Sequence, residues 1–283
     1  MRCLSDIGGC AGVWHEPLYY QLQDGDCAVL DTVVREAETC GADTVLLSYE
    51  GLSVLGGEQI RWFTDVFDDV TAVVFLRRQD QLVNSFHNHL HKVHRAGLAE
   101  IEAYERSMLD YDTECDYRRV LERWAGALGH ERLRPVVHDR SRSSVREFFG
   151  RAAMSVDYAG YVDECCNTAV DAFGLSVMRR VNGMAAGEQE LRAIMNEAHR
   201  ALSAHFVDPA WVETRYTLIL AMRRKIMDHY RRSNEWTRKH FFPERPTLFP
   251  ELEPGASGPS TTRLALSWRK RSCSLHEHVC TGC

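Results

Sequence analysis

The stretch Val73–Ser85, VVFLRRQDQLVNS, joins an apolar run, two arginines and the start of a helix. Its first four residues are apolar, as in a strand that is buried on both faces of a parallel sheet. From Leu82 onward apolar residues recur at helical spacing, and Asp80 stands where a helix N-cap is expected. A strand, a charged turn and a helix in this order predict one unit of a layered α/β fold.

Other segments extend this pattern along the chain. With its flanking residues the first strand covers Val70–Leu76, and the runs Thr44–Leu47 and Leu133–Val137 predict two more buried strands. Before the last strand, Tyr117–Leu128 has the apolar face of a helix, which Gly129 ends. Strands that alternate with helices predict an α/β fold with a mainly parallel sheet.

The C-terminal part of the chain is predicted to be helical and then disordered. The expected helices are Ala172–Val181, Glu188–Phe206 and a long amphipathic stretch from Trp211 to about Phe241. Beyond Pro243, a proline-rich segment leads to GASGPSTT, which is typical of a linker. We therefore expect one α/β domain over residues 1–250, followed by a linker and disordered tail over 251–283. The sheet part of that domain covers about 15–150 and the helical part about 165–245.

Composition and charge limit the kinds of partner. Of the 283 residues 45% are hydrophobic and 26% are charged, as in a folded globular protein, and the net charge is −6. Without a basic excess, neither nucleic acid nor an anionic membrane is an expected partner. The N-terminus has no signal-peptide pattern, and the longest apolar runs, such as Val73–Leu76 and Leu218–Met222, are too short to span a bilayer. These features predict a cytoplasmic protein without a membrane span.

Two arginines follow the strand that ends at Leu76, and open parallel sheets bind their ligands beyond the carboxyl ends of the strands. The rigid, permanently charged fork of Arg77 suits phosphate oxygens, and the hydroxyl of Ser85, eight residues later, can add a further bond. A solvated arginine at a strand end and an ordinary helical serine give the same spacing. The spacing alone leaves both interpretations open.

Val73–Ser85 resembles the 3′-phosphate-binding segment of the PAPS-dependent sulfotransferases, and more closely that of bacterial sulfotransferase-like proteins associated with surface polysaccharide synthesis. Four other parts of the chain are similar to that family in the same order, within about residues 15–250. They are Leu46–Ser53 (LLSYEGLS), the group Asp116, Tyr117, Leu121, Trp124 and Gly129, the group Asn167, Leu175 and Asn182, and the C-terminal group Ser233, Asn234 and Phe249.

The resemblance implies a three-layer, P-loop-type parallel sheet with flanking helices and a helical C-terminal part. It implies transfer of a sulfuryl group from PAPS, 3′-phosphoadenylyl sulfate, to a hydroxyl acceptor, a carbohydrate, without a metal ion. The nucleotide donor would contact Arg77, Ser85, Arg78 and Ser48.

Sulfuryl transfer also needs a group that takes the proton of the acceptor hydroxyl. Glu50 follows the first predicted strand, where the family carries an acidic residue or a histidine as base. A solvated loop glutamate or a cap of the following turn is the alternative role for this residue. His138, at the end of the last strand, is the substitute base.

One part of the family pattern is missing. Family members begin with a strand and a glycine-rich loop with a lysine, whose amides and ammonium hold the sulfate and the 5′-phosphate. This chain has no lysine before Lys92 and so no such segment. The loop, and with it the first strand of the sheet, is therefore expected to be missing. Either the reading frame begins upstream or the chain is a truncated remnant. A non-catalytic binding or interaction module is therefore the alternative function, and a kinase-like protein would need the same loop.

Histidines and cysteines also suggest metal ligands. His87, His91 and His94 share one helical face, but no carboxylate or cysteine is placed with them. We expect them to be solvated or to face a substrate. The tail has a second group of the right types: Cys273, His276, His278, Cys280 and Cys283. No domain surrounds that group to fix its geometry, so no metal site is predicted.

Overall fold

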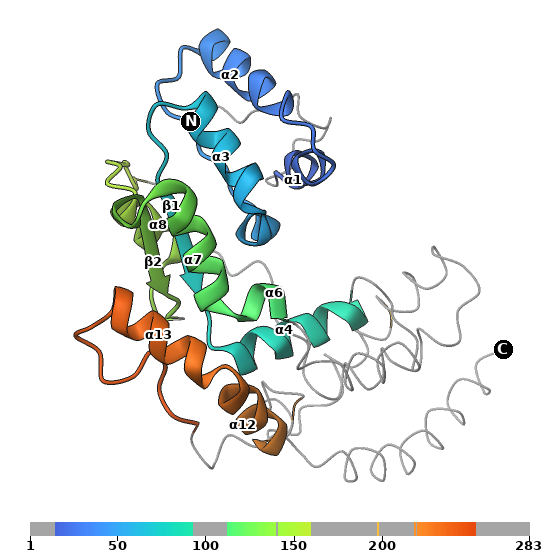
Figure 1. Ribbon diagram of the computed structural model, residues 1–283, viewed down its shortest axis with the longest axis vertical. Helices are drawn as coiled ribbons and strands as arrows, with labels where there is room; N and C mark the ends of the chain where they lie inside the picture. Colours follow the sequence, from blue (N-terminus) through green and yellow to red (C-terminus); the bar gives the residue numbers. More distant parts are fainter. Residues whose placement is uncertain are drawn as a thin grey trace, which may run out of the picture. The chain divides into compact units, whose positions relative to one another are not determined.

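The computed structural model describes residues 15–92, 112–139, 141–159, 197, 218 and 220–252 (Figure 1). The chain forms two compact units made of interleaved segments. Unit 1 consists of Met1–Arg77, Asp112–Val162 and Arg232–Leu248. Unit 2 consists of Arg78–Tyr111, Asp163–Arg231 and Phe249–Cys283.

The helices of the described residues are distributed over both units. Those of unit 1 are α1 (Glu16–Gln23), α2 (Val29–Cys40), α3 (Gly57–Val66), α6 (Asp112–Cys115), α7 (Tyr117–Leu128), α8 (Ser144–Arg151), the 3₁₀ helices η1 (Glu50–Val54) and η2 (His130–Arg132), and α13 (Arg231–Phe241), whose first residue belongs to unit 2. Those of unit 2 are α4 (Gln79–Lys92) and α12 (Leu220–His229).

In the described part of the chain the sheet has two parallel strands, β1 (Ala72–Leu76) and β2 (Leu133–Val137). Ala72 pairs with Leu133 and Leu76 with Val137, and the backbone N–H of His138 extends the ladder with a 2.8 Å bond to the carbonyl of Leu76. The parallel pairing and the surrounding helices confirm an α/β fold. The bounds predicted for β2 are confirmed, whereas β1 begins two residues later than predicted.

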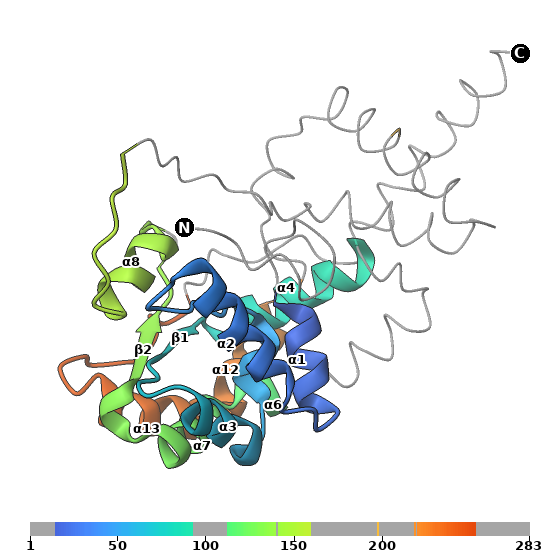
Figure 2. The same ribbon diagram turned by 90° about the horizontal axis from the view of Figure 1, so that it is seen from above.

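Helix α7 packs against β2 and α3, and it has the bounds that the sequence predicts (Figure 2). Its inner face buries Val120, Leu121, Trp124 and Leu128. Gly129 ends it at a backbone φ of +90°, a conformation that residues with a Cβ rarely adopt.

The N-terminus of α7 is capped by two side chains from different parts of unit 1. Asp116 accepts a 3.3 Å hydrogen bond from the backbone N–H of Arg119. Ser233, on α13, accepts a 2.9 Å bond from the backbone N–H of Arg118 and donates a 2.7 Å bond to the Asp116 carboxylate. Two of the N–H groups that a helix leaves unpaired in its first turn are thereby satisfied, and α13 is tied to α7.

The prediction of a strand at Thr44–Leu47 was wrong. Residues 44–49 have no strand hydrogen bonds, and Val45, Leu46 and Leu47 are only half-buried. A four-residue apolar run becomes a strand only when a neighbouring strand pairs with it. In the described residues, Ser48 is instead bound through its backbone by a histidine ring, and the chain then enters η1.

The long C-terminal helix was also predicted incorrectly. Within its described part the chain forms two helices, α12 and α13, which are interrupted at the buried Tyr230. Buried positions continue at spacings of three and four residues across the interruption, so periodicity alone favours one helix. The other predicted C-terminal helices, with Asn167, Leu175 and Asn182, and the tail beyond Leu252 lie outside the described residues.

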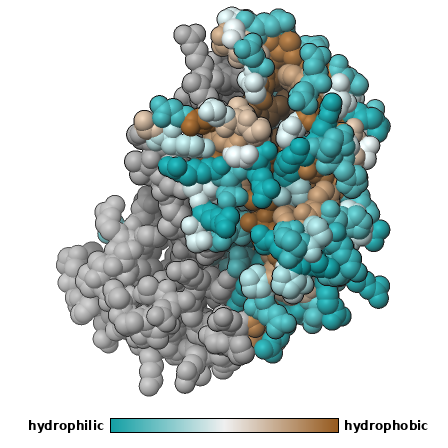
Figure 3. Space-filling model, turned by 90° about the vertical axis from the view of Figure 1, so that its left-hand side faces the viewer, coloured by the Kyte–Doolittle hydropathy of each residue, from teal (hydrophilic) through white to brown (hydrophobic). Residues whose placement is uncertain are grey.

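Hydrophilic side chains cover most of the coloured surface on the face drawn in Figure 3. Among the described residues, Tyr20 is the one large hydrophobic residue that is well exposed, at 55%. No helix in the described ranges is both long enough and apolar enough to cross a membrane.

The cap at the start of α7 gives a first prediction. Ser233→Ala removes a buried hydroxyl that serves both Arg118 and Asp116, so the free energy of unfolding should fall by about 1–2 kcal/mol. Urea unfolding of the whole chain measures this change. Ser144→Ala is the matched control, because Ser144 is exposed at the start of α8. Equal stability of the two variants would contradict the capping role.

Candidate active site

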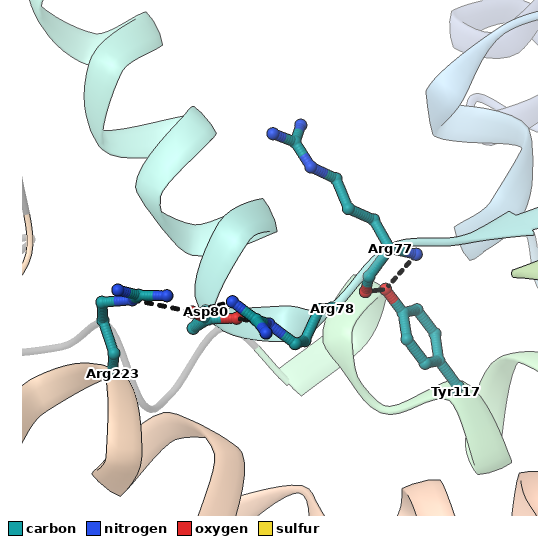
Figure 4. Close-up of polar contacts among 5 residues, drawn as sticks. All are labelled: Arg77, Arg78, Asp80, Tyr117 and Arg223. Atoms are coloured by element: carbon teal, nitrogen blue, oxygen red, sulfur yellow. Dashed lines mark hydrogen bonds and ion pairs between the residues drawn. The ribbon is translucent and has the colours of Figure 1, made fainter. Parts of the chain in front are cut away.

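Arg77 lies directly after the last residue of β1, at the carboxyl end of the strand. One side chain holds its backbone on both sides: the N–H of Arg77 donates a 3.0 Å hydrogen bond to the hydroxyl of Tyr117, and that hydroxyl donates to the carbonyl of Arg77. Figure 4 shows that the guanidinium group extends away from the tyrosine. Tyr117 therefore fixes the backbone of Arg77, while the guanidinium group of Arg77 points away from Tyr117.

Tyr117 is the first residue of α7 and is buried. Burial, helped by the neighbouring Cys115, raises the pKa of its hydroxyl far above the ordinary value. The hydroxyl therefore keeps its proton at every physiological pH. It can act as a donor and an acceptor at the same time, as the two bonds to Arg77 require.

A pair of carboxylates lies in the same unit. Glu50 begins η1 and is exposed, whereas Glu114, in α6, is half-buried. These two elements pack against each other. Burial raises the pKa of the Glu114 carboxyl, and the negative charge of Glu50 raises it further. Two carboxyl groups with different surroundings, one exposed and one half-buried, are thus neighbours in unit 1.

Helix α7 also fixes the end of η1. The guanidinium of Arg123 donates hydrogen bonds of 2.8 and 3.0 Å to the carbonyls of Val54 and Leu55. The indole N–H of Trp124 donates a 3.3 Å bond to the carbonyl of Ser53. The short helix that begins with Glu50 is thus tied to α7 by side chains of two successive residues.

Two tyrosine rings lie beside the carboxylates. The ring centroids of Tyr19, on α1, and Tyr49 are 5.3 Å apart. A Cβ at Gly51 would come within 2.6 Å of the Tyr49 ring and 3.0 Å of the Tyr19 ring, so only glycine fits between them. Burial raises the pKa of the Tyr19 hydroxyl, and the charge of Glu114 adds to this effect. Tyr19 is therefore close enough to Glu114 for the charge of that carboxylate to act on its hydroxyl.

Two other predicted site residues belong to unit 1. The backbone N–H of Ser48 donates a 3.1 Å hydrogen bond to Nδ1 of His15, which precedes α1. His138 bonds through its backbone to Leu76 and so lies at the same end of the sheet as Arg77. Ser48, Glu50, Arg77 and His138 are all part of unit 1.

The corner between α6 and α7 connects these groups. Glu114 lies beside Glu50, and Tyr117, three residues later, binds the backbone of Arg77. Charges on Arg77 and Glu114 both act on the pKa of Tyr117, which places the three groups in one electrostatic environment. The sequence gives no signal for Glu114, because a single glutamate between helices is a common surface residue. Tyr117 stands in the sequence within the family-like group at the start of this helix, but the sequence does not indicate its contact with Arg77.

The other predicted nucleotide contacts belong to unit 2. Ser85 is half-buried on α4. Arg78 forms two hydrogen bonds with Asp80, from Nε to Oδ1 at 2.7 Å and from Nη2 to Oδ2 at 3.2 Å. Arg223, on α12, adds a bond from its Nε to Oδ2 of Asp80 at 2.8 Å, as Figure 4 shows. Arg78 is thus engaged in an ion-pair cluster.

The role predicted for Asp80 was wrong. Helix α4 begins one residue earlier, at Gln79, so Asp80 lies in the first turn rather than at the N-cap. Its side chain is fully buried and faces the guanidinium groups of Arg78 and Arg223. A buried carboxylate needs such partners, since an unpaired buried charge is strongly unfavourable.

His87 is buried, with 3% of its surface exposed, so of the two positions expected for it the solvated one was wrong, and the substrate-facing one stays a prediction. It shares its helix with two buried asparagines, and one of them, Asn84, accepts a 3.3 Å hydrogen bond from the backbone N–H of Leu218. The side chain of His91, His94 and the tail cysteines and histidines lie outside the described residues. Within those ranges, no three metal-ligating side chains come together.

A scan against protein-family models and searches of curated proteins and of solved structures found no match to this chain. The site is therefore defined by its own geometry and by the sequence pattern around it.

The raised pKa of Glu114 predicts a pH-dependent stability. Its protonated form is favoured by folding, so this contribution is present below the ordinary glutamate pKa and is lost as pH rises through the folded-state value. Glu114→Gln should therefore be more stable than the unmodified chain at about pH 8, by on the order of 1 kcal/mol, with a smaller gain toward about pH 5.

Urea unfolding at the two pH values measures this difference. Glu38→Gln provides the control, because Glu38 is exposed on α2. A gain for Glu114→Gln that does not change with pH, or a loss at the higher pH, would contradict the assignment.

The ion-pair cluster of unit 2 gives a further prediction. Asp80→Asn removes the negative charge that faces both arginines, and breaking such a buried pair should lower the free energy of unfolding by about 3–5 kcal/mol. Chemical denaturation followed by circular dichroism tests this loss. Asp228→Asn, at an exposed position of α12, should change stability by less than about 0.5 kcal/mol. A loss for Asp80→Asn as small as that of the control would be inconsistent with a structural role for the cluster.

Proposed function

We propose that this protein is a cytoplasmic sulfotransferase-like enzyme with a three-layer, P-loop-type sheet, which transfers a sulfuryl group from PAPS to a hydroxyl acceptor, a carbohydrate. The observation that carries the proposal is the arrangement in unit 1: Arg77 follows the carboxyl end of β1, and the corner between α6 and α7 joins it to the Glu50–Glu114 pair. The ordered sequence segments support the choice of PAPS as donor.

The nucleotide end of the donor is held by charge. Arg77 presents its guanidinium to the 3′-phosphate, where two parallel N–H···O bonds combine attraction with direction. The family pattern also assigns a hydroxyl contact with the donor to Ser85. Ser48, two residues before Glu50 in the sequence, lies near the reacting end of the donor. Arg78, although it is bound to Asp80, contributes positive charge close to the phosphate.

The transfer itself requires a proton acceptor. The acceptor oxygen forms a bond to sulfur while the bond between sulfur and the bridging phosphate oxygen of PAPS breaks, which releases 3′,5′-ADP. Glu50, exposed and therefore accessible to an acceptor, takes the hydroxyl proton. Glu114 keeps its own proton to higher pH and limits the negative charge beside Glu50. His138 is the substitute base at the end of β2.

A binding module with the same fold, without transfer activity, is the second candidate. Nucleotide binding without transfer distinguishes this function from the first.

Calorimetric titration with 3′,5′-ADP tests the nucleotide site. The full chain should bind, and Arg77→Ala should weaken binding by about 10- to 100-fold, the usual effect of a lost charge-assisted hydrogen bond. Arg61→Ala is the matched control, because Arg61 is an exposed arginine of the same unit. Failure of the unmodified chain to bind 3′,5′-ADP, or equal affinity of Arg77→Ala, would overturn the site.

Radiolabelled PAPS and a panel of polysaccharide acceptors test the reaction. Glu50→Gln should retain nucleotide binding and lose transfer by at least about 100-fold, because a general base contributes that much to the rate. Glu122→Gln, on the exposed face of α7, should leave the rate unchanged. Binding of 3′,5′-ADP without transfer to any acceptor would favour the second candidate.

A further inference from the structure

Leu76, the last residue of β1, and Arg77, which follows it, direct their backbone groups to opposite sides. The carbonyl of Leu76 accepts its bond from His138 and therefore turns toward β2. Backbone groups of successive residues alternate in direction along an extended chain, so the N–H and carbonyl of Arg77 turn away from β2. Both of these groups bind the single hydroxyl of Tyr117. Tyr117 thus binds the side of the Arg77 backbone that turns away from β2.

This two-point contact restricts the root of the arginine side chain. The N–H and the carbonyl lie on either side of the Cα atom, so fixing both restrains the two backbone dihedral angles of Arg77. These angles set the direction of the Cα–Cβ bond. The guanidinium itself extends away from the tyrosine (Figure 4). The hydrogen bonds of Tyr117 therefore reach Arg77 at its backbone.

The chemistry of the contact requires a protonated phenol. A single hydroxyl can serve an N–H and a carbonyl only while it keeps its proton, and burial ensures this by raising the pKa of Tyr117. Phenylalanine would fill nearly the same volume without either bond. Tyr117→Phe therefore separates the effect of the hydroxyl from the effect of ring packing in unit 1.

We propose that Tyr117 is a positioning residue for anion binding: its hydroxyl fixes the backbone of Arg77 so that the guanidinium is preorganised for the 3′-phosphate of the nucleotide. This inference rests on the proposed function, since it takes Arg77 as the phosphate ligand. Preorganisation strengthens binding because less freedom is lost when the ligand arrives.

A double-mutant cycle tests the proposal. Affinity for 3′,5′-ADP is measured by calorimetry for the unmodified chain, Tyr117→Phe, Arg77→Ala and the double variant. Tyr117→Phe should weaken binding by about fivefold, and it should have no further effect once Arg77 is alanine. Tyr158→Phe is the control, because this ring packs on Arg146 and Phe149 in the same unit. A merely structural role would weaken binding equally in both backgrounds.

Hydrogen exchange of the unliganded chain tests the contact without any nucleotide. The Arg77 amide should be protected in the unmodified chain and should exchange at least about tenfold faster in Tyr117→Phe. An unprotected Arg77 amide in the unmodified chain would overturn the inference even if the variant did not fold. Faster exchange with unchanged nucleotide affinity would overturn the positioning role and leave the proposed function standing. No binding of 3′,5′-ADP by the unmodified chain would overturn both.

Discussion

The first turn of α7 is the point on which unit 1 depends. The hydroxyl of Tyr117 binds the end of β1, and Asp116 and Ser233 together cap the helix and attach α13. Farther along the helix, Arg123 and Trp124 hold the carbonyls at the end of η1. Apart from the bond between Ser233 and Asp116, these contacts pair a backbone N–H or carbonyl with a side chain, so hydrogen bonds as well as apolar packing set the geometry of unit 1.

Two neighbouring arginines are held in different ways, one through its backbone and one through its side chain. The backbone of Arg77 is held by the hydroxyl of Tyr117, and its guanidinium extends away from that ring. Arg78 is held through its side chain by a buried carboxylate, which also faces Arg223. The difference arises where β1 ends and α4 begins: strand geometry controls the first arginine, and the charge on the first helical turn controls the second.

The sequence predicted those elements whose signals are local. Apolar periodicity and Gly129 define α7, and the run at Leu133–Val137 forms β2 with the predicted bounds. The strand predicted at Thr44–Leu47 was wrong, because a strand forms only beside a pairing strand, and the sequence of one segment does not show whether it has one. Of the site, Glu50 and Arg77 could be proposed from their places after apolar runs. Glu114 could not be proposed from the sequence. Its raised pKa arises from burial and from the charge of Glu50, and both act on it only in the folded chain.

The central claim is that Arg77 receives the 3′-phosphate of the nucleotide donor. Nuclear magnetic resonance of the Arg77 side-chain Nε–H group, with 3′,5′-ADP and with 5′-AMP, tests it most directly, because the two nucleotides differ only in the 3′-phosphate. We expect 3′,5′-ADP to shift this resonance and 5′-AMP to leave it nearly unchanged. An equal response to both nucleotides, or no response to either, would contradict it.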